Sequence, residues 1–151
     1  MSETANIVDQ LKRAFEGNAW HGPALNELLA GVSAEQAAAR PLSRAHTIWE
    51  IVRHIITWET VVCKRLKGER VDKPDEGDWG DVADTSAAAW DTTLASLRRT
   101  QEALVEQAAA LTDATLQETA VGTDYSVYFM LHGVIQHNLY HGGQIALLKQ
   151  A

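Results

Sequence analysis

Apolar residues recur along the chain at helical spacing, and turn-forming residues separate the segments that carry them. Residues 3–16 place Ile7, Leu11 and Phe15 at steps of four, and Gly17 follows as a helix stop signal. The period-2 alternation that is typical of strands is nearly absent. The pattern therefore predicts an amphipathic helix over residues 3–16 at the start of an all-helical chain.

Shorter helices are predicted between this segment and the next long one. Pro23 suits the first turn of a helix, because a residue at that position needs no backbone N–H partner. Ser33 and Gln36 form a capping-box pair, in which side chain and backbone satisfy each other at a helix start. Pro41 then closes this region.

Three further long helices follow. Thr47 and Glu50 form a second capping-box pair, and a polar, acidic loop occupies residues 69–85. The long helices are predicted over 47–68, 86–111 and 124–149. With the helix over 3–16, they indicate an all-α, four-helix bundle whose additional short helices lie between the first and second long helices. No internal repeat or linker divides the chain, so we expect one domain over residues 1–151.

The last two long helices each carry a seam of core positions with a 4-3 rhythm, which marks the face toward a bundle core. The seams read Trp90, Leu94, Leu97, Gln101, Leu104, Ala108 and Leu111, and then Met130, Val134, His137, His141, Gln144 and Leu148. Two histidines and a glutamine thus occupy positions in the last helix where leucine would be expected.

Composition narrows the class of protein. The chain has 151 residues, a hydrophobic fraction of 46% and a formal net charge of −7, so nucleic acid and anionic membranes would be repelled on average. No apolar run approaches the roughly 18 residues of a membrane span, and the first residues lack a signal-peptide core. The one cysteine, Cys63, allows no internal disulfide. We expect a cytoplasmic protein.

His137 and His141 are the residues whose spacing points most directly to chemistry. Four residues apart on a helix, their imidazoles lie about 40° apart around the axis and can bind one transition-metal ion. Such a site needs a third ligand, and His54 is a candidate because it lies beside the apolar line of Ile51 and Trp58. Alternatively, a backbone carbonyl or polar neighbour satisfies each histidine separately.

Other polar residues have a functional and a plain interpretation. Gln144 can donate to a bound water or substrate, or can be a satisfied core amide. Glu50, one turn before His54, can orient that imidazole or simply complete the capping box. Trp58 suits core packing or a pocket wall. The predicted core face of its helix consists of Ile48, Ile51, Ile55, Trp58 and Val62. Trp79, in the acidic loop, can fold over a pocket or over a partner subunit.

Three segments together resemble the DinB family (DinB/YfiT-like) of metalloenzymes, which are four-helix bundles. They are AWHGPALNELL near the start, HTIWEIVRHIITWE in the second long helix and GVIQHNLYHGGQIALLK in the last. The resemblance implies a divalent ion, zinc or nickel, held by His54, His137 and His141. It also places His21, otherwise a simple loop histidine, at the border of the pocket.

Three histidine ligands leave a coordination position open, where an ion can activate water or a low-molecular-weight thiol. Relatives include transferases and isomerases that use bacillithiol or mycothiol, which implies thiol S-transferase or hydrolase-like chemistry on a small-molecule substrate. The family also implies a homodimer. The alternative is a non-enzymatic bundle in which a metal or small ligand serves a stress response, sensing or stability. A di-iron carboxylate site is disfavoured because no Glu-x-x-His occurs.

Overall fold

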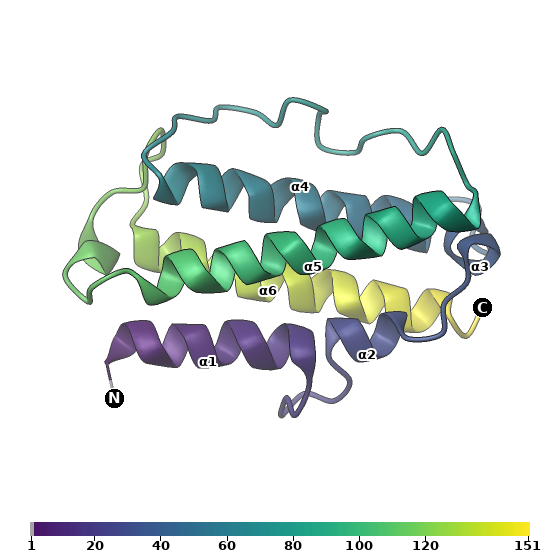
Figure 1. Cartoon of the computed structure of the whole chain (residues 1–151), viewed down its shortest axis with the longest axis horizontal. Helices are drawn as coiled ribbons and strands as arrows, with labels where there is room; N and C mark the ends of the chain where they lie inside the picture. Colours follow the sequence, from purple (N-terminus) through teal and green to yellow (C-terminus); the bar gives the residue numbers. More distant parts are fainter. Residues whose placement is uncertain (1) are drawn as a thin grey trace.

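Four long helices lie side by side, and two short helices join the first of them to the second (Figure 1). The computed structural model describes residues 2–151, and within this range it contains helices and no strand. The elements are α1 (Glu3–Glu16), α2 (Leu25–Leu29), α3 (Ala34–Ala38), α4 (Ile48–Leu66), α5 (Ala87–Ala109), the 3₁₀ turn η1 (Thr115–Gln117) and α6 (Val127–Leu148). The prediction of an all-helical bundle with short helices between the first two long ones is confirmed.

The start of α4 has the predicted capping box. The Thr47 hydroxyl accepts the backbone N–H of Glu50 at 3.1 Å, and the Glu50 carboxylate accepts the backbone N–H of Thr47 at 2.8 Å. The helix ends at Leu66, and Gly68 follows with φ +87°, a left-handed conformation that favours glycine. Both ends of this helix therefore come from local sequence signals.

Helix α6 begins later than predicted, at Val127 and not at residue 124. The preceding residues belong to a tight turn, in which the Tyr125 carbonyl accepts the backbone N–H of Ala120 at 2.9 Å. The Ser126 hydroxyl then caps the helix by accepting the N–H of Phe129 at 3.1 Å. The turn satisfies backbone groups that a longer helix would otherwise have bonded internally.

The buried face of α4 matches the prediction except at one position, where the buried residue is the one after the predicted residue. Ile51, Ile55 and Val62 are buried as expected, but Trp58 is only half-buried. Its neighbour Glu59 is completely buried instead. The core seam of α4 is the 4-3 series Ile48, Val52, Ile55, Glu59 and Val62.

A long loop connects α4 to α5 and runs along the outside of α4 (Figure 1). Arg53 holds it through Glu76 at 2.9 Å, and Lys64 holds it through Asp75 at 3.1 Å. These contacts bring residues 78–79 over the middle of α4. Within residues 2–151, no helix is both long enough and apolar enough to cross a lipid bilayer.

Candidate metal centre

Three histidines from two helices meet between α4 and α6. The Nε2 atoms of His54 and His137 lie 3.0 Å apart, and one ring nitrogen from each of His54, His137 and His141 falls within 4.8 Å of the others. His54 and His141 are buried, with 6% and 4% of their surfaces exposed. The structure thus brings together the three histidines that the sequence singled out.

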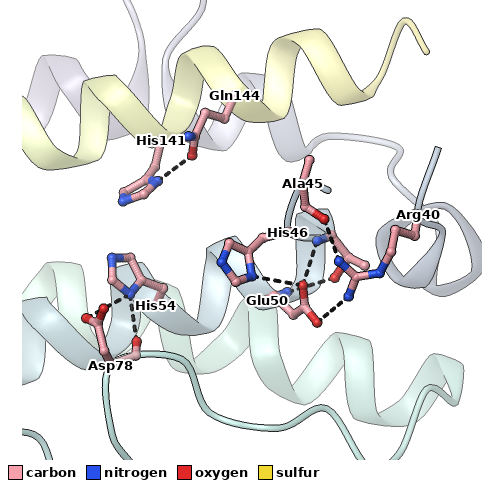
Figure 2. Close-up of polar contacts among 9 residues, drawn as sticks. Arg40, Ala45, His46, Glu50, His54, Asp78, His141 and Gln144 are labelled. Carbon is pink, nitrogen blue, oxygen red and sulfur yellow. Dashed lines mark hydrogen bonds and ion pairs between the residues drawn. The ribbon is translucent and has the colours of Figure 1, made fainter. Parts of the chain in front are cut away.

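Hydrogen bonds fix the orientation of two of these rings. His54 Nδ1 donates to the backbone carbonyl of Asp78 at 2.7 Å, and His141 Nδ1 donates to the Gln144 side-chain oxygen at 2.7 Å (Figure 2). A proton on Nδ1 leaves Nε2 with a free lone pair, which is the form that binds metal. Gln144 therefore holds a ligand ring in place.

The local environment favours the neutral forms of His137 and His141. Burial, with smaller contributions from the neighbouring His141 and His54, lowers the pKa of His137 to about 4. Burial is also the main cause of the lowered pKa of His141. His137 Nδ1 is buried and has no hydrogen-bond partner. Because His54 carries its proton on Nδ1, His137 Nε2 carries the proton of the 3.0 Å hydrogen bond to His54 Nε2 when no cation is bound. A shift of that proton to His137 Nδ1 frees both Nε2 atoms to bind an ion.

The donor set fits a transition-metal ion. Metal–nitrogen bonds of 2.0–2.1 Å in a tetrahedral site place ligand nitrogens about 3.4 Å apart. The observed range, from 3.0 Å to at most 4.8 Å, includes that separation. Neutral imidazole nitrogens suit zinc, nickel, copper and iron better than the oxygen-preferring magnesium or calcium.

An aromatic stack covers one side of the cluster. The Trp79 ring lies parallel to His54, with centroids 3.9 Å apart, and its opposite face lies parallel to His46, with centroids 3.5 Å apart. Trp58 donates from its indole nitrogen to the Asp78 carboxylate at 2.8 Å and so fixes the residue before Trp79. The acidic loop therefore folds over the histidines, one of the two placements that its sequence left open.

Comparison with known proteins identifies the family. The model of the DinB superfamily matches residues 19–145, a span that includes all three histidines. The chain belongs to the DinB superfamily. No curated protein and no solved structure matches the chain. Membership of the superfamily and the three-histidine cluster together point to a divalent metal ion, without identifying which one.

Glu50 lies at the edge of this DinB-superfamily site and does not orient His54. Its carboxylate accepts from the Thr47 backbone, from Arg40 at 2.6 Å and from His46 Nδ1 at 3.2 Å (Figure 2). Burial alone would raise the pKa of Glu50, but the bonds from Thr47 and Arg40 lower it below its usual value. The partner that does orient His54 is the Asp78 carbonyl, which no spacing rule could have indicated.

His21 lies away from the three-histidine cluster of this DinB-superfamily chain. It is exposed and lines a pocket of about 550 Å³ between the α1–α2 region and α6. Gly142 and Leu28 line the same pocket, and none of the three clustered histidines does. The structure thus places His21 beside a different cavity from the metal centre.

A second polar contact lies in the core and was not predicted from the sequence. Asn138 of α6 donates from its side-chain nitrogen to Glu59 of α4 at 2.7 Å, and both residues are buried. A signal was present, because Glu59 lies four residues after Ile55 on a 4-3 seam. Asn138 belongs to a similar seam in α6, which reads Val127, Leu131, Val134, Asn138, His141, Ile145 and Leu148.

Proposed function

We propose that this DinB-superfamily protein is a metal-dependent enzyme that holds one divalent ion, zinc or nickel, on His54, His137 and His141. The observation that carries the proposal is the convergence of three imidazoles, because three protein ligands leave a coordination position for an outside molecule. When bound, the ion supplies a Lewis acid that lowers the pKa of a coordinated water or thiol.

The residues around the histidines have separate tasks in this proposal. Gln144 and the Asp78 carbonyl hold the His141 and His54 rings in their metal-binding tautomers. Trp79 shields the face of His54 from water, because its ring lies parallel to the imidazole. Shielding of this kind strengthens the electrostatic interactions inside a site.

The reaction that we propose is thiol S-transfer or a hydrolase-like reaction on a small molecule. The support is the family relationship, together with a ligand set that contains nitrogen and no thiolate. Such a set leaves the ion electrophilic enough to bind an incoming thiol as thiolate.

Cobalt(II) substitution tests for the open position. The visible absorption of the cobalt-loaded protein should change saturably when dithiothreitol is added. The His141→Ala variant, treated in the same way, should show no such saturable change. If the cobalt spectrum of the intact protein changes neither with thiol nor with added anions, the site is closed, and the enzymatic proposal is contradicted.

One observation favours the alternative, a non-enzymatic metal-binding bundle. His54 and His141 are each more than nine-tenths buried, and Trp79 covers one side of the cluster. In that case, the ion would serve stability or sensing, and its removal would lower the free energy of unfolding without abolishing a reaction. The cobalt experiment separates the two proposals, because only the enzymatic one requires a ligand to exchange.

A homodimer is part of the same proposal. The outer face of α6 carries three largely exposed side chains, Phe129, Tyr140 and Leu147. Gly133 and Gly143 lie between them in the same 4-3 pattern, and no other residue in the described part of the chain packs against either glycine. A second helix can pack on such a 4-3 stripe. Light scattering should give a dimer mass that Tyr140→Lys reduces to a monomer mass. Trp20→Lys, at an exposed residue outside α6, should leave the dimer intact, and a monomeric wild type would refute the assembly.

A further inference from the structure

The core between α4 and α6 contains an acid and an amide in contact. Glu59 has no exposed surface, and Asn138 is 4% exposed. Asn138 Nδ2 donates to Glu59 Oε1 at 2.7 Å. An ionised carboxylate at such a depth normally has a cation or several donors beside it. Among residues 2–151, Glu59 forms no ion pair, and its one hydrogen-bond donor is this neutral amide.

Two acceptor atoms in this pair have no donor. Glu59 Oε2 and Asn138 Oδ1 are both buried, and neither has a hydrogen-bond partner. A carboxylate offers only acceptors, so an ionised Glu59 leaves both atoms unsatisfied. A proton on Oε2 turns that oxygen into a donor, and the side chain already bonded to Glu59 offers it an unsatisfied acceptor, Asn138 Oδ1. One proton thus removes two unsatisfied groups at once.

The groups near Glu59 leave it without a balancing charge. Cys63, one turn further along α4, is buried, and its pKa is raised to about 11 by burial and by the charge of Glu59. Lys67 lowers the Cys63 pKa but does not act on Glu59 itself. From α6, Asn138 faces Glu59, and the pKa of its neighbour His137 is lowered to about 4, so His137 offers no positive charge at neutral pH. Burial raises the pKa of Glu59 to about 8, against the smaller, opposite effect of the Asn138 bond.

We propose that Glu59 is a neutral carboxylic acid in the folded protein at neutral pH, and that its proton completes a two-bond acid–amide latch with Asn138. The latch joins α4 to α6 five residues after His54 and one residue after His137. Glu59 and Asn138 are therefore positioning residues for the two helices that carry the metal ligands. This second part rests on the proposed metal-binding function, whereas the protonation state does not.

Carbon-13 NMR of the side-chain carboxyls tests the proton directly in metal-free protein. The Glu59 resonance is assigned by its loss in Glu59→Gln, and Glu102→Gln, at an exposed glutamate on α5, is the control. The Glu59 carboxyl should have the chemical shift of a neutral acid at pH 6.5 and should titrate near pH 8, well above 4.5. A carboxylate shift at pH 6.5 would overturn the proposal.

Substitution tests the positioning role. Glutamine can make the same two bonds as the protonated acid, so Glu59→Gln should bind zinc with an affinity close to that of the wild type at pH 6.5. Glu59→Leu, which removes both bonds, should weaken zinc binding by about tenfold or more, as loss of outer partners of a metal site does. A Glu59→Gln protein that folds but binds zinc about tenfold more weakly than the wild type would refute the latch, even if Glu59→Leu does not fold.

The two tests fail in different ways. If the wild type binds no zinc, the proposed function is wrong, and the carboxyl titration still decides the state of Glu59. If zinc binds but Glu59 titrates near its ordinary value, the latch is wrong and the metal centre stands.

Discussion

Two polar clusters lie close together between α4 and α6, and each contains buried nitrogen or oxygen atoms that have no hydrogen-bond partner. In one, His54 and His137 bring ring nitrogens to 3.0 Å. In the other, Glu59 and Asn138 leave an oxygen each without a donor. The comparison shows that the atoms of a buried polar cluster indicate which cation suits it. Nitrogens in a three-way cluster suit a transition-metal ion, whereas an oxygen pair suits a proton.

Burial shifts the pKa values of the two clusters in opposite directions, but toward neutrality in both. It lowers the pKa of His137 from 6.5 to about 4 and raises that of Glu59 from 4.5 to about 8. The stability that the neutral histidine permits is lost as the pH falls from 6.5 toward 4. The stability that the neutral glutamic acid permits is lost as the pH rises from 4.5 toward 8. We therefore expect the metal-free protein to be most stable at an intermediate pH.

The largest expected effect is on the response to metal. Zinc at a thousand times its dissociation constant should raise the free energy of unfolding of the wild type by about 4 kcal/mol. Removal of a ligand in His137→Ala should abolish that increase, as measured by denaturant unfolding with and without zinc. His132→Ala is the matched control, because His132 lies on the same helix outside the cluster. Equal stabilisation of all three proteins would rule out the cluster as the site.

The second prediction concerns the acid cluster and its pH dependence. Relative to Glu59→Gln, the free energy of unfolding of the wild type should fall by about 3 kcal/mol between pH 4.5 and pH 7, since the unfolded chain loses this proton earlier. Urea unfolding of the metal-free proteins at several pH values gives the difference. A difference that is constant across this range would show that Glu59 titrates normally.

A smaller effect is expected at the aromatic cover. Trp79→Ala removes the ring that lies parallel to His54, so the zinc should dissociate faster and its affinity should fall by roughly tenfold. Chelator-driven zinc release measures the rate. Trp20→Ala, at a fully exposed tryptophan, should release zinc at the wild-type rate. Identical rates in all three proteins would mean that Trp79 does not shield the site.

The smallest effect separates helix capping from metal binding. Glu50→Ala removes the capping-box carboxylate of α4 and should lower the free energy of unfolding by about 1 kcal/mol. Zinc stoichiometry should stay the same, because Glu50 bonds Thr47, Arg40 and His46 and not His54. A large loss of zinc would restore Glu50 as a partner of the metal site.

The sequence predicted most of the helices because their signals are local. The hydroxyl cap at Thr47 and the glycine after α4 act within a few residues, whereas the turn before α6 depends on a backbone pairing between Thr119 and Ser126 that no cap motif specifies. The site was predictable to the extent that a four-residue spacing places His137 beside His141. That His54 joins them came from the family resemblance, since it depends on how two helices cross.

The remaining features required three-dimensional contacts. The Asp78 carbonyl that holds His54 is a backbone atom of a loop, and its position depends on ion pairs such as that between Arg53 and Glu76. Glu59 was overlooked for a different reason. The predicted core face of α4 included Trp58, but the next residue, Glu59, is the buried one. A shift of one residue on a helix turns a core position into a boundary position.

The most direct test of the central claim is elemental analysis of untagged protein purified without added metal, beside the His137→Ala/His141→Ala double variant. The account predicts close to one zinc or nickel ion per chain in the wild type and none in the double variant. Equal metal content in the two proteins, or no metal in the wild type together with no binding on titration, would contradict it.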